Sequence, residues 1–330
     1  MPATQSKTIA IVGATGVVGR TIETVLEERG FAVDNYVPVA TGRRGQKETT
    51  AFGKTWTLTA PDDVDFSGID VAFFSAGASV SEMLVPKAVD RGCRVVDNTT
   101  AFRMDRNVPL VVPEINATRV GGDAMLVACP NCTAIVLVMS LAPLLAAVPV
   151  ERVVMTSFQS VSGAGREALC ELDEQIEADA GDKAPQVEVL PRQIAFNCVP
   201  VIGDALESGY TKEEEKIVEE SQKILDEPEL KIVPTAVRVP TRVGHAIAVN
   251  VELKEPLAPG RAIELWKSAP GVTYSDEVPT PLDAAGSDMV IAGRVRRDPT
   301  RPNAITYWVV GDNLRKGAAT NSVQIAELFL

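Results

Sequence analysis

A short apolar run that ends in a glycine-rich turn constrains the fold of this chain more than any other feature. Residues 8–12 are typical of a buried strand, the turn Gly13-Ala14-Thr15-Gly16-Val17-Val18-Gly19 follows, and a helical pattern continues to Arg29. Small residues at such a turn let a phosphate group approach the helix N-terminus, where backbone N–H groups lack partners. The spacing is not the commoner G-x-G-x-x-G, but its position favours a dinucleotide site over an empty tight turn.

The same alternation continues through the first 130 or so residues. Further strands are predicted at 35–40, 71–75 and 94–97, with a helix at 79–91. This order is typical of α/β proteins with a Rossmann-like doubly wound parallel sheet. The final segment, 318–330, has the pattern of an amphipathic helix, and we expect it to return to this domain. The first domain is therefore predicted to comprise residues 1–131 and 318–330.

Beyond residue 150 the pattern changes to longer strands mixed with helices, which indicates an α+β domain over residues 132–317. Its strands are predicted at 152–160, 231–239 and 245–253, and its helices at 166–178 and 211–225. Proline-rich connections near 185–200 and 270–281 are typical of long surface or interface loops.

Composition narrows the class of protein. A formal net charge of -12 and a pI near 4.8 argue against nonspecific binding to nucleic acid or anionic membranes. The start of the sequence has no hydrophobic region after a basic one, so it does not predict a secretory signal, and the cytoplasm is the expected location. Five cysteines are an odd count and do not indicate a disulfide framework.

An uncharged stretch at residues 124–150 is long enough to cross a bilayer. Pro130, Asn131, Pro143 and Pro149 punctuate it, however, and favour a buried strand at 124–128, a turn, and an apolar helix at 133–147. Cys132 then lies at a strand-to-helix turn. The first turn of a helix offers unpaired N–H groups and the positive end of its dipole, which favour a thiolate, so Cys132 is the predicted nucleophile.

Cys129 and Cys132 also have C-x-x-C spacing, so a zinc site or dithiol redox chemistry is an alternative. The chain has no second C-x-x-C and one histidine, too few ligands for the usual zinc site, and no thioredoxin-like unit at its start. We therefore predict no metal, and a buried strand position for Cys129. His245 is the only histidine available as an acid/base partner for Cys132. A purely structural role for His245 is the alternative.

The remaining motifs are ambiguous from pattern alone. Thr41, Arg43 and Arg44 occupy the turn after the second strand, where an acidic residue would bind the ribose of NAD, and they favour NADP over a solvated basic turn. The segment 158–166 ends a strand in a glycine-rich turn that is either a loop cap or cofactor-facing. Glu213 to Lys216 read as a solvated helix face.

These pieces together resemble the aspartate-β-semialdehyde dehydrogenase family. The matching segments run in order along nearly the whole chain: 13–16, 97–103, 130–133, 158–165, 194–197, 238–245 and 321–324. The resemblance implies an NADPH-dependent reduction of L-aspartyl-4-phosphate to the semialdehyde and phosphate, within lysine, threonine and methionine biosynthesis, by a homodimer.

The resemblance also implies a role for each matching residue. Cys132 would form a thioester, His245 would be the acid/base catalyst, and Gln159 would orient the reacting group. Arg238 would bind the substrate carboxylate, and Glu214 the α-amino group. Phosphate would be received by Arg103, Asn131 and Lys216. The implied NADP contacts are Gly13, Ala14, Thr15, Gly16, Val17, Val18, Thr41, Arg43, Arg44, Ser75, Ala76, Gly77, Thr99, Ser162, Gly163, Ala164, Gly165 and Asn321.

Two rival functions stay open at this level. An N-acetyl-γ-glutamyl-phosphate reductase shares the architecture and thioester chemistry but takes an acylated amine, so a carboxylate facing the substrate would argue against it. A noncatalytic Rossmann protein that senses NADP would need neither Cys132 nor His245.

Overall fold

The computed structural model describes residues 7–41 and 45–330. The chain divides into two compact units, one formed by Met1–Pro130 with Ala318–Leu330 and the other by Asn131–Gly317. The C-terminal segment thus belongs to the same unit as the glycine turn.

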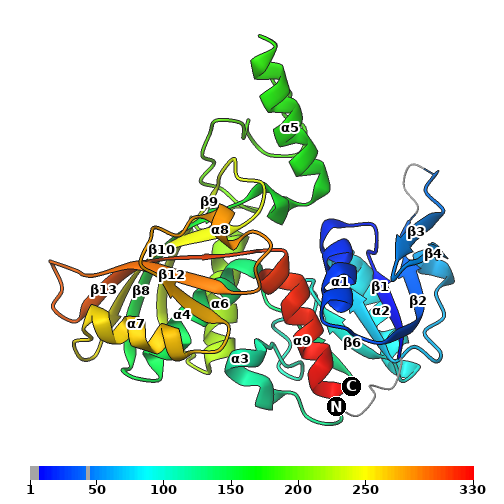
Figure 1. The fold of residues 1–330 in the computed structure, drawn as a ribbon, viewed down its shortest axis with the longest axis horizontal. Coiled ribbons are helices and arrows are strands. Elements are labelled where there is room, and N and C mark those ends of the chain that lie inside the picture. Colours follow the sequence, from blue (N-terminus) through cyan, green and yellow to red (C-terminus); the bar gives the residue numbers. More distant parts are fainter. Residues whose placement is uncertain (1–6, 42–44) are drawn as a thin grey trace. The chain divides into compact units, whose positions relative to one another are not determined.

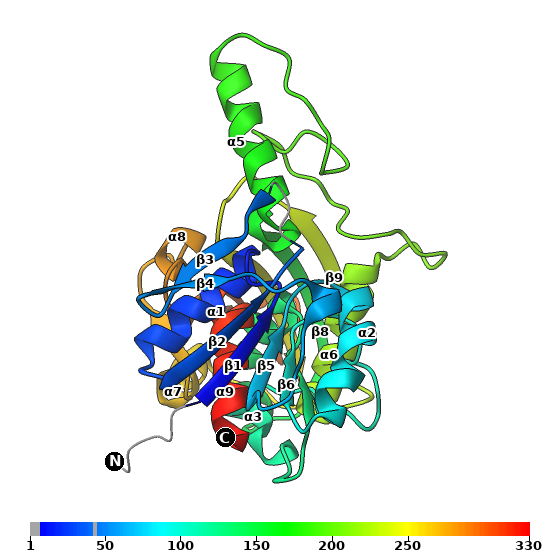
Figure 2. The same cartoon turned by 90° about the vertical axis from the view of Figure 1, so that its right-hand side faces the viewer.

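The first unit is built on a five-stranded parallel sheet. Its strands are β1 (Lys7–Val12), β2 (Val33–Val39), β5 (Val71–Phe74), β6 (Arg94–Asp97) and β7 (Leu126–Ala128), in the order β2-β1-β5-β6-β7. Parallel neighbours need crossover connections. Helix α1 (Val17–Glu28) joins β1 to β2, and α2 (Ala78–Asp90) joins β5 to β6 (Figure 2). The predicted Rossmann-like sheet is confirmed.

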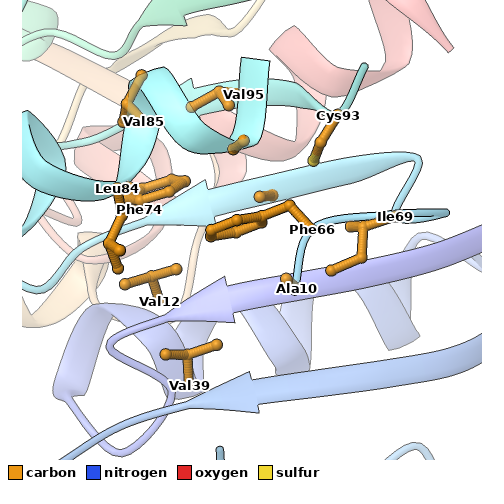
Figure 3. Close-up of a cluster of buried hydrophobic side chains, with 12 residues drawn as sticks. Ala10, Val12, Val39, Phe66, Ile69, Phe74, Leu84, Val85, Cys93 and Val95 are labelled. Atoms are coloured by element: carbon orange, nitrogen blue, oxygen red, sulfur yellow. The ribbon is translucent and has the colours of Figure 1, made fainter. Parts of the chain in front are cut away.

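Both faces of this sheet are buried. On one face, alternate strand residues such as Ala10, Val12 and Phe74 pack with Leu84 and Val85 of α2 (Figure 3). The residues between them point the other way, and Ile9, Ile11 and Phe73 are also fully buried. Burial on two faces explains why the central strands β1 and β5 are apolar at nearly every position.

Shorter elements complete the first unit. Helix α9 (Thr320–Phe329) contacts α1 and β6. The sequence did not predict the hairpin of β3 (Glu48–Ala51) and β4 (Lys54–Thr57), since both strands are short and polar. The other elements are α3 (Pro113–Asn116) and the 3₁₀ turns η2 (Pro61–Asp63) and η3 (Ala117–Arg119).

The second unit is built on a six-stranded mixed sheet (Figure 1). Its order is β11-β12-β13-β10-β8-β9, formed by β8 (Val150–Gln159), β9 (Lys231–Arg238), β10 (His245–Leu253), β11 (Val272–Ser275), β12 (Val290–Arg297) and β13 (Ala304–Gly311). Strands β8, β9 and β10 were predicted from the sequence, whereas β11, β12 and β13 were not. The helical elements are α4 (Cys132–Leu145), η4 (Val161–Ala164), α5 (Arg166–Ala180), α6 (Lys212–Leu225), α7 (Pro259–Ser268), α8 (Pro281–Ala284) and the π-helical turn η5 (Arg315–Ala319).

Strand directions bring functional positions to one edge of this sheet. β8 runs parallel to β9, with Gln159 opposite Arg238, and antiparallel to β10, which begins at His245. The ends of β8 and β9 therefore meet the start of β10. Helix α4 packs against α6, α7 and the sheet. The apolar run of α4 is consequently a core helix, and none of the helices within residues 7–41 and 45–330 is long and apolar enough to cross a membrane.

Candidate active site

Cys132 is the first residue of helix α4, one position before the predicted start. The Asn131 side chain caps the helix, because its Oδ1 accepts the backbone N–H groups of Thr133 at 2.8 Å and Ala134 at 3.1 Å. Gly317 packs directly on the cysteine, since a Cβ at that position would lie 2.9 Å from Cys132 Cβ. The cap and this contact hold the sulfur at the positive end of the helix dipole.

His245 lies beside that sulfur. Its Nε2 is 3.3 Å from Cys132 Sγ, and its Nδ1 is 3.1 Å from the backbone nitrogen of Ser160. The imidazole is completely buried. Burial, and secondarily the positive charge of Arg238, lower the pKa of His245 from 6.5 to about 3. The ring is therefore neutral at physiological pH.

A buried arginine and an amide complete the cluster. Arg238 Nη1 donates to the Ser160 carbonyl at 2.7 Å, and burial lowers its pKa while Cys132 and Glu213 act in the opposite sense. Gly163 leaves room for this guanidinium, because a Cβ there would lie 3.0 Å from Nη1. Gln159 Nε2 is 3.3 Å from Glu213 Oε1. One buried cation thus lies among a thiol, an imidazole, an amide and a carboxylate.

The carboxylate in this cluster is Glu213, one residue before the predicted Glu214. Asn131 Nδ2 donates to Glu213 Oε1 at 2.9 Å, and Lys216 Nζ lies 3.7 Å from its Oε2. Glu214 instead closes the capping box of α6. Its Oε2 accepts the Thr211 N–H at 2.8 Å and its Oε1 accepts the Ala236 N–H at 2.9 Å. Both oxygens of Glu214 therefore bond backbone N–H groups, whereas the carboxylate of Glu213 faces Asn131 and Gln159.

The glycine turn in the first unit has the geometry of a phosphate cradle. Gly13 has φ +100, and a Cβ there would lie 2.8 Å from Ser75 Oγ. Gly19 is equally constrained, since its Cβ would lie 2.3 Å from the Gly13 carbonyl oxygen. Gly16 is the N-cap of α1, and no side chain caps the first backbone N–H groups of that helix. Backbone N–H groups without a side-chain cap, in a turn that a ligand can approach closely, suit the diphosphate of a dinucleotide.

Several other predicted cofactor residues have structural partners within their own unit. Ser75 Oγ donates to the Val12 carbonyl at 3.3 Å, and Thr99 Oγ1 donates to Asp97 at 2.9 Å. Asn321 Nδ2 donates to the Val111 carbonyl at 2.9 Å. Thr41 is exposed, Ala76 follows β5, and Gly77 is the N-cap of α2 with φ 97. Arg43 and Arg44 lie outside the described residues.

The predicted turn Ser162-Gly163-Ala164-Gly165 belongs to the second unit. Ser162 is buried, Gly163 packs against Arg238 and His245, and Gly165 is the N-cap of α5 with φ 94. Arg103 belongs to the first unit, where its Nε donates to the Cys129 carbonyl at 2.9 Å and its Nη2 to the Asn98 carbonyl at 2.7 Å.

All five cysteines are free, and Cys129 is fully buried, with Asn321 Nδ2 3.4 Å from its sulfur. Within the described residues no group of three or more His, Cys, Asp or Glu side chains could hold a metal ion. Sequence reasoning missed Asn313, which bonds Ser160, Ser162 and Gly244, and Gly317 behind the thiol. Neither has a local signal, because each acts on residues far away in the chain.

A dinucleotide cradle in one unit and a cysteine–histidine pair beside a buried arginine in the other define a class, the dehydrogenases that work through a cysteine. Residues 8–122 match the NAD-binding domain of semialdehyde dehydrogenases, and residues 141–316 match their dimerisation domain.

Full-length relatives narrow the class further. The chain is 44% identical to an aspartate-semialdehyde dehydrogenase of Legionella pneumophila, covering 97% of this chain and 95% of the relative. It is 42% identical to that of Bacillus subtilis, covering 97% and 96%. The crystal structure of aspartate-semialdehyde dehydrogenase II from Vibrio cholerae, complexed with ASA, has a TM-score of 0.95 at 41% identity and covers 98% of both chains. The chain belongs to the aspartate-semialdehyde dehydrogenase family.

Proposed function

We propose that this chain reduces L-aspartyl-4-phosphate to L-aspartate-4-semialdehyde and phosphate with NADPH, reversibly, through a thioester on Cys132. The observation that supports it most strongly is the 3.3 Å contact between Cys132 Sγ and His245 Nε2 at the start of α4, within a chain of this family. A nucleophilic thiol converts the acyl phosphate into a thioester that accepts a hydride. The pathway served is the biosynthesis of lysine, threonine and methionine, in the cytoplasm.

The buried charges of the second unit match the ends of an aspartyl substrate. Arg238 uses one donor on the Ser160 carbonyl, and the rest of its planar guanidinium suits the α-carboxylate. Glu213 suits the α-amino group, and Gln159 beside it orients the acyl group. Asn131, Lys216 and Arg103 are proposed for phosphate, although Arg103 already bonds two backbone carbonyls in its own unit.

The substrate pairing gives a direct test. Turnover of aspartyl phosphate and of N-acetylglutamyl phosphate would be measured with NADPH under the same conditions. The proposal predicts activity on the first substrate alone, because an acylated amine has no positive charge to pair with Glu213. Preference for the second substrate would identify the rival reductase. If neither acyl phosphate formed an adduct with Cys132, the proposed thioester reaction would be wrong.

For the cofactor we propose the turn Gly13 to Val18 for the diphosphate and the turn Thr41 to Arg44 for the ribose 2'-phosphate. The rest of the dinucleotide is proposed to contact Ser75 to Gly77, Thr99, the turn Ser162 to Gly165 and Asn321. When bound, the reduced dinucleotide supplies the hydride.

The choice of NADP over NAD depends on Arg43 and Arg44 in this proposal. A guanidinium makes charge-assisted hydrogen bonds to a 2'-phosphate that NAD lacks. Replacing both by Ala should lower kcat/KM for NADPH by roughly 10- to 150-fold per lost charged hydrogen bond, from about 1.5–3 kcal/mol each. The same measurement with NADH is the control. An equal change for both cofactors would remove these arginines from the site.

A homodimer is proposed through the segment that begins at α5. Figures 1 and 2 show α5 and its following loop extending away from the sheet of their own unit. This segment exposes large apolar side chains, namely Ile176, Val187, Val189, Phe196, Val201 and Tyr210. Exposed apolar side chains that are concentrated on one segment are typical of a protein interface, and the matching family domain is a dimerisation domain.

A further inference from the structure

A buried carboxylate holds the turn that carries the nucleophile. The backbone N–H of Asn131 donates to Glu220 Oε2 at 2.5 Å, and the two residues are 89 positions apart in the sequence. Glu220 lies on α6 and is only 1% exposed. Burying a carboxylate is costly unless it is hydrogen-bonded, so this contact is specific. The proposed reaction gives Glu220 no contact with substrate or cofactor.

Asn131 connects this carboxylate to Cys132. The first N–H groups of a helix have no partner within the helix. At the start of α4, the N–H groups of Thr133 and Ala134 bond Asn131 Oδ1. The N–H of Asn131 itself bonds Glu220. Cys132 lies between these groups as the first residue of the helix, so the position of its sulfur depends on the position of Asn131.

Two carboxylates of α6 bond Asn131. Glu213 Oε1 accepts from Asn131 Nδ2 at 2.9 Å, and Glu220 Oε2 accepts from the Asn131 backbone. The two glutamates are seven residues apart, which is close to two turns of an α-helix, so their side chains leave the helix in nearly the same direction. One face of α6 therefore holds Asn131 at both its side chain and its backbone.

Helix α6 is itself bonded to the sheet. Glu214 Oε1 accepts the N–H of Ala236 on β9 at 2.9 Å, and Glu214 also closes the capping box with Thr211. Strand β9 ends at Arg238, the guanidinium proposed for the substrate carboxylate. A single helix thus relates the turn before Cys132 to the groups that suit the two ends of the substrate.

We propose that Glu220 is a positioning residue for the thioester reaction. Its carboxylate holds Asn131, and thereby the Cys132 sulfur, in register with Glu213 and Arg238. The bond to Asn131 is a feature of the structure alone, whereas its importance for turnover rests on the proposed function. Two other roles would give different results. A carboxylate at the start of a helix stabilises that helix by its charge, and a buried hydrogen bond stabilises the fold without affecting the chemistry.

Three substitutions separate reach, charge and stability. Glu220→Gln keeps the length of the side chain and an oxygen that accepts the Asn131 N–H, but it removes the charge. Glu220→Asp keeps the charge but is one methylene group shorter, and Glu220→Ala keeps neither. A reacting group displaced by about 1 Å can lose about 100-fold in rate. We expect kcat to fall by about 100-fold in Glu220→Ala and Glu220→Asp, and by less than about 10-fold in Glu220→Gln, which keeps the hydrogen bond.

Further measurements separate the positioning role from the other two. KM for aspartyl phosphate should change less than kcat, because the groups proposed to bind its ends are intact. Rates are expressed per folded molecule, with the free energy of unfolding measured on each variant. Glu219→Ala is the control, because Glu219 is the neighbouring, exposed residue of α6, and its kcat should stay within about 2-fold of the wild type.

Two kinetic results would overturn the proposal. A kcat for Glu220→Asp above that of Glu220→Gln would show that the charge matters and the position does not. An unchanged kcat per folded molecule in Glu220→Ala would show a role in stability alone.

The bond to Asn131 can be measured on the wild-type protein without substrate. The full-length chain, labelled with ¹⁵N-asparagine, would be studied by amide hydrogen exchange in NMR. We expect the Asn131 N–H to exchange at least about 100-fold more slowly than in an unstructured chain, because it exchanges only when the local structure opens. Glu220→Gln should keep this protection.

Rapid exchange of the Asn131 N–H in the wild type would overturn the proposal even if no variant folded. A wild type that forms no product from aspartyl phosphate would instead refute the proposed function, and with it the kinetic role of Glu220. The exchange rate would still decide whether Glu220 holds the turn, so the two failures are distinguishable.

Discussion

The two proposed binding sites are built from different parts of the chain. The cradle of the first unit is made of backbone, with Gly13, Gly16 and Gly19 at the start of α1 and no side-chain cap on that helix. The cluster of the second unit is made of side chains, and each of its polar groups is held by another group. A backbone site tolerates no added volume, whereas a side-chain site tolerates no lost charge or donor. This difference decides which substitutions should damage each site.

The largest effect should come from Cys132→Ala, which should abolish turnover because the acyl group has nothing to attach to. NADP affinity should stay near that of the wild type, since the glycine turn is untouched. Steady-state kinetics measures turnover, and titration with NADP measures cofactor affinity. Cys129→Ala is the control and should keep activity within a few-fold. Collapse of both variants with folding intact would favour dithiol chemistry instead.

Adjacent glutamates test the side-chain site next. Glu213→Gln should lower kcat/KM for aspartyl phosphate by roughly 10- to 150-fold, the value of one charged hydrogen bond of about 1.5–3 kcal/mol. Glu214→Gln should instead lower the free energy of unfolding by about 1–2 kcal/mol through the weakened cap, with smaller kinetic change. Kinetics and denaturant unfolding on both variants separate the roles. The reverse pattern would restore Glu214 to the site.

Gly19→Ala tests the backbone site. A methyl group would lie 2.3 Å from the Gly13 carbonyl oxygen, so the turn must shift. We expect NADP to bind about 10-fold more weakly, for a shift that costs about 1–2 kcal/mol. Calorimetric titration checks it, with Gly122→Ala as the control, because nothing lies within 4 Å of a Cβ at that position and, as at Gly19, the backbone is not at positive φ. Cofactor affinity equal to that of the wild type would show that the turn does not form the cradle.

The last prediction concerns stability in acid rather than turnover or cofactor binding. His245 has its pKa lowered from 6.5 to about 3, so between these values the unfolded chain binds a proton that the folded chain does not. Folding stability therefore falls as the pH drops below 6.5, and at about pH 5 the loss from this residue is about 2 kcal/mol. His245→Gln should remove that part of the pH dependence. Parallel stability curves for the two proteins would contradict the lowered pKa.

Much of the fold could be predicted because its signals are local. The alternation of apolar runs and helices before residue 130 follows from burial of a parallel sheet on two faces, as Ile9, Ala10 and Ile11 show. Cys132 could be placed at a helix start because Pro130 and Asn131 end the strand before an apolar helix. The β3–β4 hairpin was missed since each strand has only four residues, and the two buried positions of β3, Thr49 and Ala51, are too few to set a recognisable pattern.

The sequence by itself determined the class of fold, the glycine turn, the position of Cys132 and the family, because each depends on neighbours in the chain. Only the tertiary structure decided which glutamate faces Asn131, since adjacent helical residues point about 100° apart and the pattern of three glutamates is uniform. It alone placed Nε2 of His245 beside Cys132, 113 positions away, and bonded Asn313 to Gly244 and Ser160. Such contacts depend on strand order and register, which no local segment encodes.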